Sequence, residues 1–190
     1  MRDNRVRLLA EMGLAIALFA VLAYFKIPTP FNLFGGSVSL AMLPIVVLAL
    51  LRGPWVGLAV GVLCGCIDIM FDPYIVHPAQ LILDYPLAYG AVGSAGFLSS
   101  AVRRALDGKK TVIAASYTVA AVVFGTAMRF IPAFMSGMIF FGEFAPEGQP
   151  VWLYSLLYQL GYLPASALVV SIVAVLVVPV LYSTLGKENA

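Results

Sequence analysis

The sequence predicts an all-α integral membrane protein that crosses the bilayer six times and keeps both termini in the cytoplasm. The composition indicates the class: 62% of the 190 residues are hydrophobic and 11% are charged, whereas an average soluble domain carries roughly 25% charged residues. The length limits the number of spans, because each spanning helix needs about 20 mostly apolar residues. We therefore expect residues 1–190 to form a single membrane domain.

Apolar runs separated by helix breakers mark the six predicted spans. The first lies near residues 8–26 and ends before Pro28. It exceeds the apolar core of a signal peptide, about 7–15 residues, and no small-residue cleavage site follows it, so we expect a retained helix. The second is short for a span. The remaining predictions, in chain order after the first, are helices near 38–51, 55–71, 79–102, 111–132 and 151–182.

The positions of lysine and arginine indicate the orientation. Cytoplasmic loops of membrane proteins carry an excess of these residues. With the N-terminus inside, nine of the eleven basic residues fall on the cytoplasmic side and only Lys26 and Arg129 fall near the outer side. The cytoplasmic set is Arg2, Arg5, Arg7, Arg52, Arg103, Arg104, Lys109, Lys110 and Lys187.

The predicted outer loops have a different character, because they contain aromatic, acidic, proline and glycine residues. They lie near residues 28–36, at 72–77, and from about 133 to 150. Loops of this kind suit a lid over an outward-facing pocket. A belt of interfacial aromatic side chains is the alternative interpretation.

Acidic residues inside apolar spans are costly and are therefore functional candidates. Glu11, Asp68 and Asp84 are such residues. Glu11 lies near the inner interface, where its carboxylate can reach water. Asp84 is the strongest candidate because Gln80 lies one helical turn before it, and Tyr85 beside it has Tyr89 one turn later. The alternative is a carboxylate that is satisfied by hydrogen bonds between helices.

Tyrosines recur at helical spacing at the start of the last predicted span. Tyr154, Tyr158 and Tyr162 are each four residues apart, and Gln159 lies among them. Aromatic rings attract a flat organic cation by stacking and cation–π contact, and a carboxylate neutralises its charge. The pattern favours such a ligand, although an interfacial tyrosine belt would have the same spacing.

Small residues form a stripe along the first predicted helix. Ala10, Gly13, Ala17 and Ala20 recur on a seven-residue pattern. Small side chains let helices approach closely in a membrane, so this stripe is either an internal packing seam or a docking face for another membrane subunit.

Motifs of soluble and intramembrane enzymes are missing from the sequence. It has no Walker A loop, no HExxH pair and no GxSxG elbow. Cys64 and Cys66 have too few potential ligands near them for a zinc site. We therefore expect no enzyme activity, cofactor, metal or nucleic-acid partner, and interpret the chain as a binding protein in the lipid bilayer.

Three stretches resemble the thiamine-specific substrate-binding subunit, or S component, of energy-coupling factor (ECF) vitamin transporters. They are GGSVSLAMLPI at 35–45, HPAQLILDYPLAYG at 77–90 and SGMIFFGEFAPEGQPVWLYSLLYQLGYLPAS at 136–166. The resemblance implies the six-helix S-component fold in the plasma membrane and a vitamin pocket under the first outer loop. It also implies docking through Gly13, Ala17 and Ala20 onto a transmembrane coupling subunit, which two cytoplasmic ATPases would drive.

The resemblance also implies binding residues. The acid that pairs with the thiamine cation falls on Asp84, with Tyr85 beside it, and the tyrosine of the last helix falls on Tyr154. An aromatic position of the outer loop falls on Phe141. With Gln80, Tyr158 and Gln159, these residues make up the predicted pocket.

Two positions depart from the family pattern. Ala133 stands where the family usually has a histidine, and Gln159 stands where it has an asparagine. Alanine offers no hydrogen bond, and glutamine moves the amide by one methylene. The cargo is therefore thiamine, a thiamine precursor or another flat heterocycle, and a membrane scaffold without a ligand is the alternative from another class.

Overall fold

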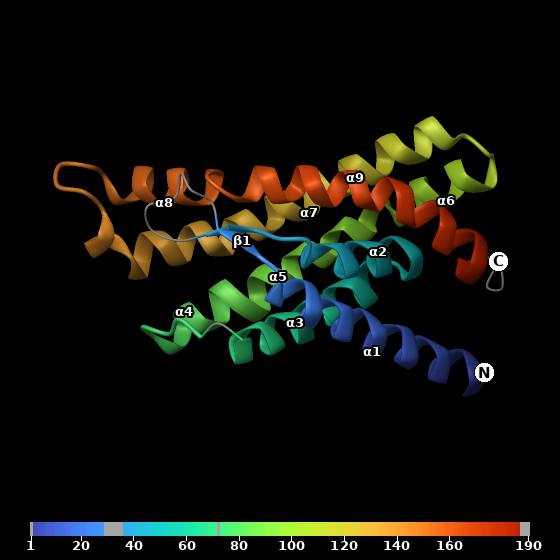
Figure 1. Cartoon of the computed structure of the whole chain (residues 1–190), viewed down its shortest axis with the longest axis horizontal. Coiled ribbons are helices and arrows are strands. Elements are labelled where there is room, and N and C mark those ends of the chain that lie inside the picture. Colours follow the sequence, from blue (N-terminus) through green and yellow to red (C-terminus); the bar gives the residue numbers. More distant parts are fainter. Residues whose placement is uncertain (1, 29–35, 72, 187–190) are drawn as a thin grey trace.

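The computed structural model describes residues 2–28, 36–71 and 73–186 and shows an elongated bundle of helices (Figure 1). Its first half consists of α1 (Arg2–Tyr24), β1 (Ile27–Pro28), β2 (Ser37–Val38), α2 (Met42–Arg52), α3 (Pro54–Phe71), α4 (Pro78–Ile82), a π-helical turn (Leu83–Leu87) and α5 (Ala88–Val92). Its second half consists of a 3-10 helix (Gly93–Leu98), α6 (Ser99–Asp107), α7 (Thr111–Phe140), a 3-10 turn (Gly142–Phe144), α8 (Val151–Leu160), α9 (Leu163–Leu181) and a closing π-helical turn (Tyr182–Gly186).

The predicted class is confirmed, since the described residues form long apolar helices. Five helical stretches are long and apolar enough to cross a membrane: Arg5–Tyr24, Pro54–Phe71, Pro78–Asp107, Thr111–Phe140 and Val151–Thr184.

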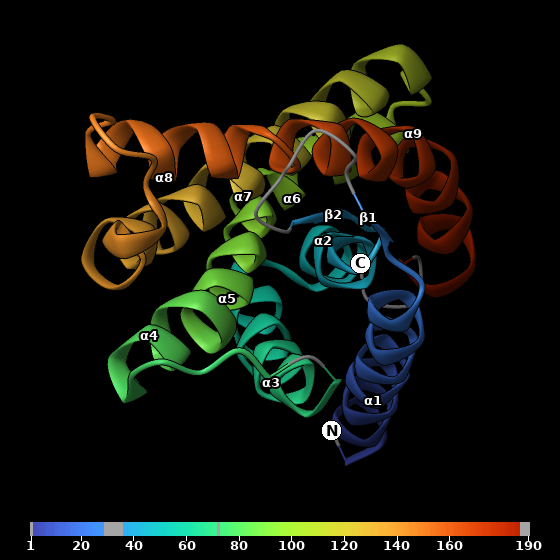
Figure 2. The same cartoon turned by 60° about the vertical axis from the view of Figure 1, so that its left-hand side comes forward.

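The second predicted span is a short central helix. α2 has 11 residues, ten of them buried, and a helix of that length is only about 16 Å long. It lies in the middle of the bundle, against α1, α3 and α9 (Figure 2). Apolar residues lie on every face of α2, as expected for a helix that neighbouring helices surround.

Glycines allow the third and fourth helical stretches to pack at backbone distance. Gly61 and Gly65 of α3 face the π turn and α5. A Cβ atom at Gly61 would lie 2.9 Å from the Cα of Gly90, and one at Gly65 would lie 2.6 Å from the Cα of Pro86. This close seam fixes the segment that carries Asp84 against α3.

Three predicted boundaries differ from the structure. The stretch predicted at 79–102 runs from Pro78 to Asp107 and contains a π turn, because Pro86 has no N–H to donate to the preceding turn. The span predicted at 111–132 continues to Phe140, so the outer loop begins eight residues later than expected. The segment predicted at 151–182 is interrupted between α8 and α9 at residues 161–162, just before Pro164.

Both described ends of the chain lie at one end of the long axis, together with the turn between α6 and α7 (Figure 1). This placement agrees with the expectation that the termini share one side, whereas the cytoplasmic assignment stays a prediction. At this end Glu11 of α1 pairs with Arg52 at the end of α2, with 2.5 Å between Arg52 Nη2 and Glu11 Oε1. Glu11 therefore has a structural partner.

Candidate functional site

The described residues enclose a cavity of about 640 Å³. Its size falls in the range of small-molecule sites, about 300–1,000 Å³. Its walls come from the end of α1, β2, the start of α2, α3, α4, the π turn, α5, α7, the 3-10 turn at Gly142–Phe144, α8 and the start of α9. Every pocket residue predicted from the sequence lines this cavity, namely Gln80, Asp84, Tyr85, Phe141, Tyr154, Tyr158 and Gln159.

Gln80 fixes the carboxylate of Asp84. Its Nε2 donates to Asp84 Oδ2 at 2.6 Å and to the carbonyl of Tyr74 at 3.1 Å, while its Oε1 accepts from the backbone N–H of Val76 at 3.2 Å. Because both amide hydrogens and the amide oxygen are used, Gln80 positions Asp84 and the loop before α4. Gln80 is 1% exposed, so this buried side chain is held in place as part of the cavity wall.

Tyrosines supply much of the cavity wall, since six of the nine in the chain line it. The ring of Tyr74 stacks on Phe141 with 5.9 Å between ring centres, and the hydroxyl of Tyr85 accepts the backbone N–H of Tyr74 at 3.0 Å. On the other wall Tyr158 lies between Tyr154 and Tyr162, with ring centres 6.3 Å and 5.9 Å away. The aromatic spacing read from the sequence therefore describes a pocket wall.

Gln159 joins α8 to α7 at the position that departs from the family pattern. Its Nε2 donates to the carbonyl of Ala133 at 3.2 Å, and its Oε1 accepts from the Tyr162 hydroxyl at 2.7 Å. Ser155, one turn earlier, donates to the carbonyl of Phe134 at 2.9 Å. Ala133 was expected in an outer loop, but it lies within α7, so its backbone carbonyl serves as part of the wall.

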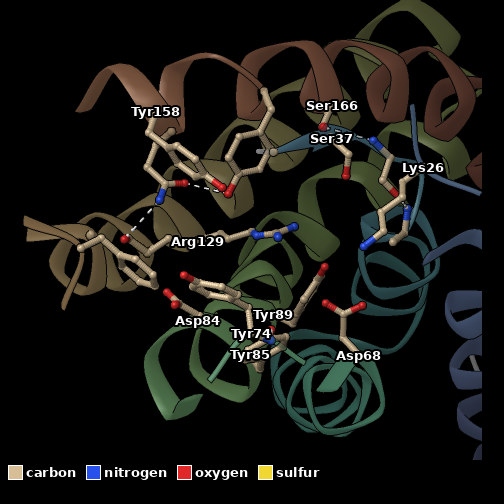
Figure 3. Close-up of a pocket in the computed structure, with 18 of the residues that line it drawn as sticks. Lys26, Ser37, Asp68, Tyr74, Asp84, Tyr85, Tyr89, Arg129, Tyr158 and Ser166 are labelled. Carbon is tan, nitrogen blue, oxygen red and sulfur yellow. Dashed lines mark hydrogen bonds between the residues drawn. The ribbon is translucent and has the colours of Figure 1, made fainter. Parts of the chain in front are cut away.

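Charged residues that the sequence analysis left out of the pocket also line it: Lys26, Asp68 and Arg129. The guanidinium carbon of Arg129 lies 4.1 Å from the centre of the Tyr89 ring. Figure 3 shows Arg129 between Asp84 and Asp68, above the tyrosines of α5 and the π turn. A usable signal was present, because Lys26 and Arg129 are the two basic residues that the orientation analysis placed on the outer side.

The predicted lid loop lies mostly outside the described residues, including Pro30, Phe31, Phe34 and Gly35. The base of this loop is described. β1 and β2 pair antiparallel, with Ile27 opposite Val38 and Pro28 opposite Ser37. Gly36 and Ser37 line the cavity, so the described base of this loop belongs to the cavity wall.

The small-residue stripe of α1 is not an internal packing seam. Gly13 and Ala17 are exposed, Ala20 is half-buried, and a Cβ atom at Gly13 would have no neighbour within 4 Å. The opposite side of α1 packs on the bundle through Ala15 and Phe19. The stripe therefore faces outward.

Comparison with known proteins shows consistent similarity to one family. Residues 9–185 match the family model described as thiamine transporter protein. The chain is 40% identical over 140 residues to the thiamine transporter ThiT of Bacillus subtilis, covering 73% of each protein. It is 33% identical over 170 residues to ThiT of Lacticaseibacillus paracasei, covering 87% of this chain and 82% of that protein.

A solved structure agrees with this assignment. The structure of ThiT from Listeria monocytogenes superposes with a TM-score of 0.80 at 26% identity and covers 97% of both chains. The similarity thus extends over the helices that build the cavity.

Proposed function

The chain belongs to the thiamine transporter protein family, and from that premise we propose that it captures thiamine in the cavity as the S component of an ECF importer. The observation that carries the proposal is the Asp84 carboxylate, held by Gln80 at the wall of a cavity that six tyrosines line. Thiamine carries a permanent positive charge on one flat ring and has a second flat ring. The carboxylate offsets the charge, and Tyr85, Tyr154 and Tyr158 offer cation–π contacts and stacking surfaces.

Binding of thiamine by the purified chain in detergent tests this proposal. Calorimetry should detect one site per chain. Asp84→Asn keeps the side-chain shape and removes the charge, so we expect the dissociation constant to rise at least tenfold, about 1.4 kcal/mol.

Asp107→Asn is the matched control, because Asp107 accepts a hydrogen bond from Tyr182 at 2.8 Å on an element outside the cavity. This variant should bind thiamine like the unchanged chain. Equal affinity of the Asp84→Asn variant and the unchanged chain would remove Asp84 from the site.

A related heterocycle is the second candidate cargo, and the pair Ala133 and Gln159 favours it. A site built around hydrogen bonds discriminates strongly when a partner is lost. The neutral aminopyrimidine half of thiamine is the informative probe. Tighter binding of this probe than of thiamine would identify a precursor importer, and its affinity should be unaffected by Asp84→Asn.

The outward stripe of α1 supports a partner. In our proposal Gly13, Ala17 and Ala20 dock on a transmembrane coupling subunit, and two cytoplasmic ATPases supply the energy. This division of labour places ATP hydrolysis in the partners, in keeping with a sequence that has no Walker A loop. A chain that binds neither probe and purifies with a membrane partner that lacks ATPases would instead support the scaffold alternative.

A further inference from the structure

The cavity contains a cation of its own close to the carboxylate that a cationic ligand needs. Arg129 lines the cavity, and its charge acts on both Asp84 and Asp68. An arginine that paired with Asp84 would neutralise it and repel a cationic ligand. Its planar fork suits bidentate pairing with a carboxylate.

Arg129 and Asp84 nevertheless do not form an ion pair in the described structure. Among the residues it describes, none forms a salt bridge with Asp84. The guanidinium of Arg129 instead lies over the face of Tyr89, 4.1 Å from the ring centre (Figure 3). Its Nε is buried without a hydrogen-bond partner in the described part of the chain, so the present position leaves one donor unsatisfied.

Tyr89 can hold a guanidinium only if its own ring is fixed. Phe19 of α1, which is fully buried, meets the ring of Tyr89 edge-on, with 5.0 Å between centres and 89° between planes. The backbone of Tyr89 lies against Gly61 of α3. Phe19 thus restrains the ring of Tyr89, and Gly61 restrains its main chain.

We propose that Tyr89, braced by Phe19, is a positioning residue that holds Arg129 away from Asp84 and so leaves Asp84 to a cationic ligand. This inference rests on the proposed function, because it concerns the cation that the same cavity takes up. Phe19, Tyr89 and the guanidinium of Arg129 thus contact one another in series, from α1 to the cavity. Arg129 in this arrangement is an internal competitor kept out of the ligand position.

The test is a double-mutant cycle on thiamine binding by the purified chain. Tyr89→Leu removes the π face, so Arg129 can pair with Asp84, and the dissociation constant of thiamine should rise at least tenfold. Arg129→Gln removes the competitor, so this variant should bind thiamine at least as tightly as the unchanged chain. In the Arg129→Gln background, Tyr89→Leu should then have an effect of less than threefold.

A structural role of Tyr89 alone would give a different result. Loss of packing would weaken thiamine binding equally with and without Arg129, and that additive outcome would overturn the inference. Tyr89→Phe keeps the π face and should rescue most of the affinity. Tyr117→Leu, which changes an exposed tyrosine of α7 outside the cavity, is the matched control for removal of a tyrosine.

Phe19→Leu provides the second route if Tyr89→Leu does not fold. It removes the brace without touching the cavity, and we expect a threefold to tenfold weaker affinity that again disappears with Arg129→Gln. The neutral aminopyrimidine half of thiamine should bind these variants and the unchanged chain alike, since it does not compete with Arg129 for charge. If the unchanged chain binds thiamine but the cycle is additive, only this inference fails. If the unchanged chain binds no thiamine, the proposed function fails with it.

Discussion

Gln159 and Ala133 are linked by a hydrogen bond. The amide of Gln159, one methylene longer than that of asparagine, reaches the backbone carbonyl of Ala133, whose own side chain is only a methyl group. The Nε2 of Gln159 ends on the carbonyl of Ala133, and its Oε1 is taken by Tyr162. Ala133 and Gln159 are 6% and 5% exposed and both line the cavity, so a larger group at either position would take up space in the cavity or press on its wall. We therefore expect the two departures from the family pattern to compensate for each other in the wall.

This coupling predicts non-additive substitutions. Gln159→Asn shortens the amide and loses the contact with Ala133, while Ala133→His overfills the wall beside the glutamine. Each change alone should weaken thiamine binding about tenfold, roughly 1.4 kcal/mol.

The double variant restores the hydrogen-bonding pair of the resemblance and should recover at least half of the lost free energy. Calorimetry of the four chains measures this coupling. Strictly additive losses would contradict the compensation.

The residues of the proposed binding site differ in how well the sequence predicts them. Asp84, Tyr154 and Tyr158 follow from helical spacing and from the cost of a charge in a span. Arg129 was missed although it is one of two basic residues predicted on the outer side, because a cation beside a carboxylate site for a cation runs against simple charge complementarity. In our proposal the ring of Tyr89 holds this cation in place. Glu11 likewise finds Arg52 across 41 positions of the chain, a pairing that no local pattern contains.

At the scale of elements, helix breakers predicted the order of the helices along the chain well, but they predicted the ends of the helices poorly. Pro132 lies inside α7, and the helix continues for eight residues to Phe140. Proline is tolerated in membrane helices because neighbouring helices satisfy the freed backbone groups. Pro86 has the opposite effect, because a π turn forms around it in the segment that holds Asp84 and Tyr85. Sequence alone does not tell these two prolines apart.

The π turn predicts a selective effect of Pro86→Ala. Restoring the N–H allows regular helical hydrogen bonding, which would rotate Asp84 and Tyr85 relative to α7. We expect thiamine affinity to fall at least tenfold while the thermal midpoint in detergent stays the same or rises.

Pro179→Ala is the control for this change, since Pro179 lies inside α9 and outside the cavity. That variant should keep the affinity of the unchanged chain. Full affinity in the Pro86→Ala variant would show that the π turn does not orient the site.

The outward face of α1 predicts a separation between ligand binding and coupling. Ala17→Leu adds bulk to the exposed stripe, so it should reduce co-purification with the coupling subunit at least tenfold and leave thiamine affinity within twofold. Ala127→Leu adds the same bulk to an exposed position of α7 and should change neither quantity. Unchanged assembly of the Ala17→Leu variant would exclude this face as the docking surface.

The whole molecule is divided along its long axis. The described ends of the chain and the turn between α6 and α7 lie at one end, and α4 and the start of α8 lie at the other (Figure 1). The sequence predicted these two different ends, because most lysines and arginines gather in the termini and loops of one side. It did not predict the central position of α2, since an apolar run of 11 residues fits a buried helix as well as a shortened span.

Sidedness gives a prediction for the intact cell. In a chain with Cys64 and Cys66 replaced by Ala, Glu147→Cys places a thiol in the outer loop before α8, and Lys110→Cys places one at the start of α7. Both positions are exposed and lie on opposite ends of α7 and its flanking turns. The excess of basic residues beside Lys110 predicts that this end lies in the cytoplasm.

A membrane-impermeant maleimide should therefore label Glu147→Cys in intact cells, and should label Lys110→Cys only after the membrane is opened. Protection of the outer thiol by thiamine would add that the cavity opens on the same side. The reverse labelling pattern would invert the orientation, and it would place the Asp84 cavity on the side where the ATPases are proposed to act, so capture from outside could no longer be its role.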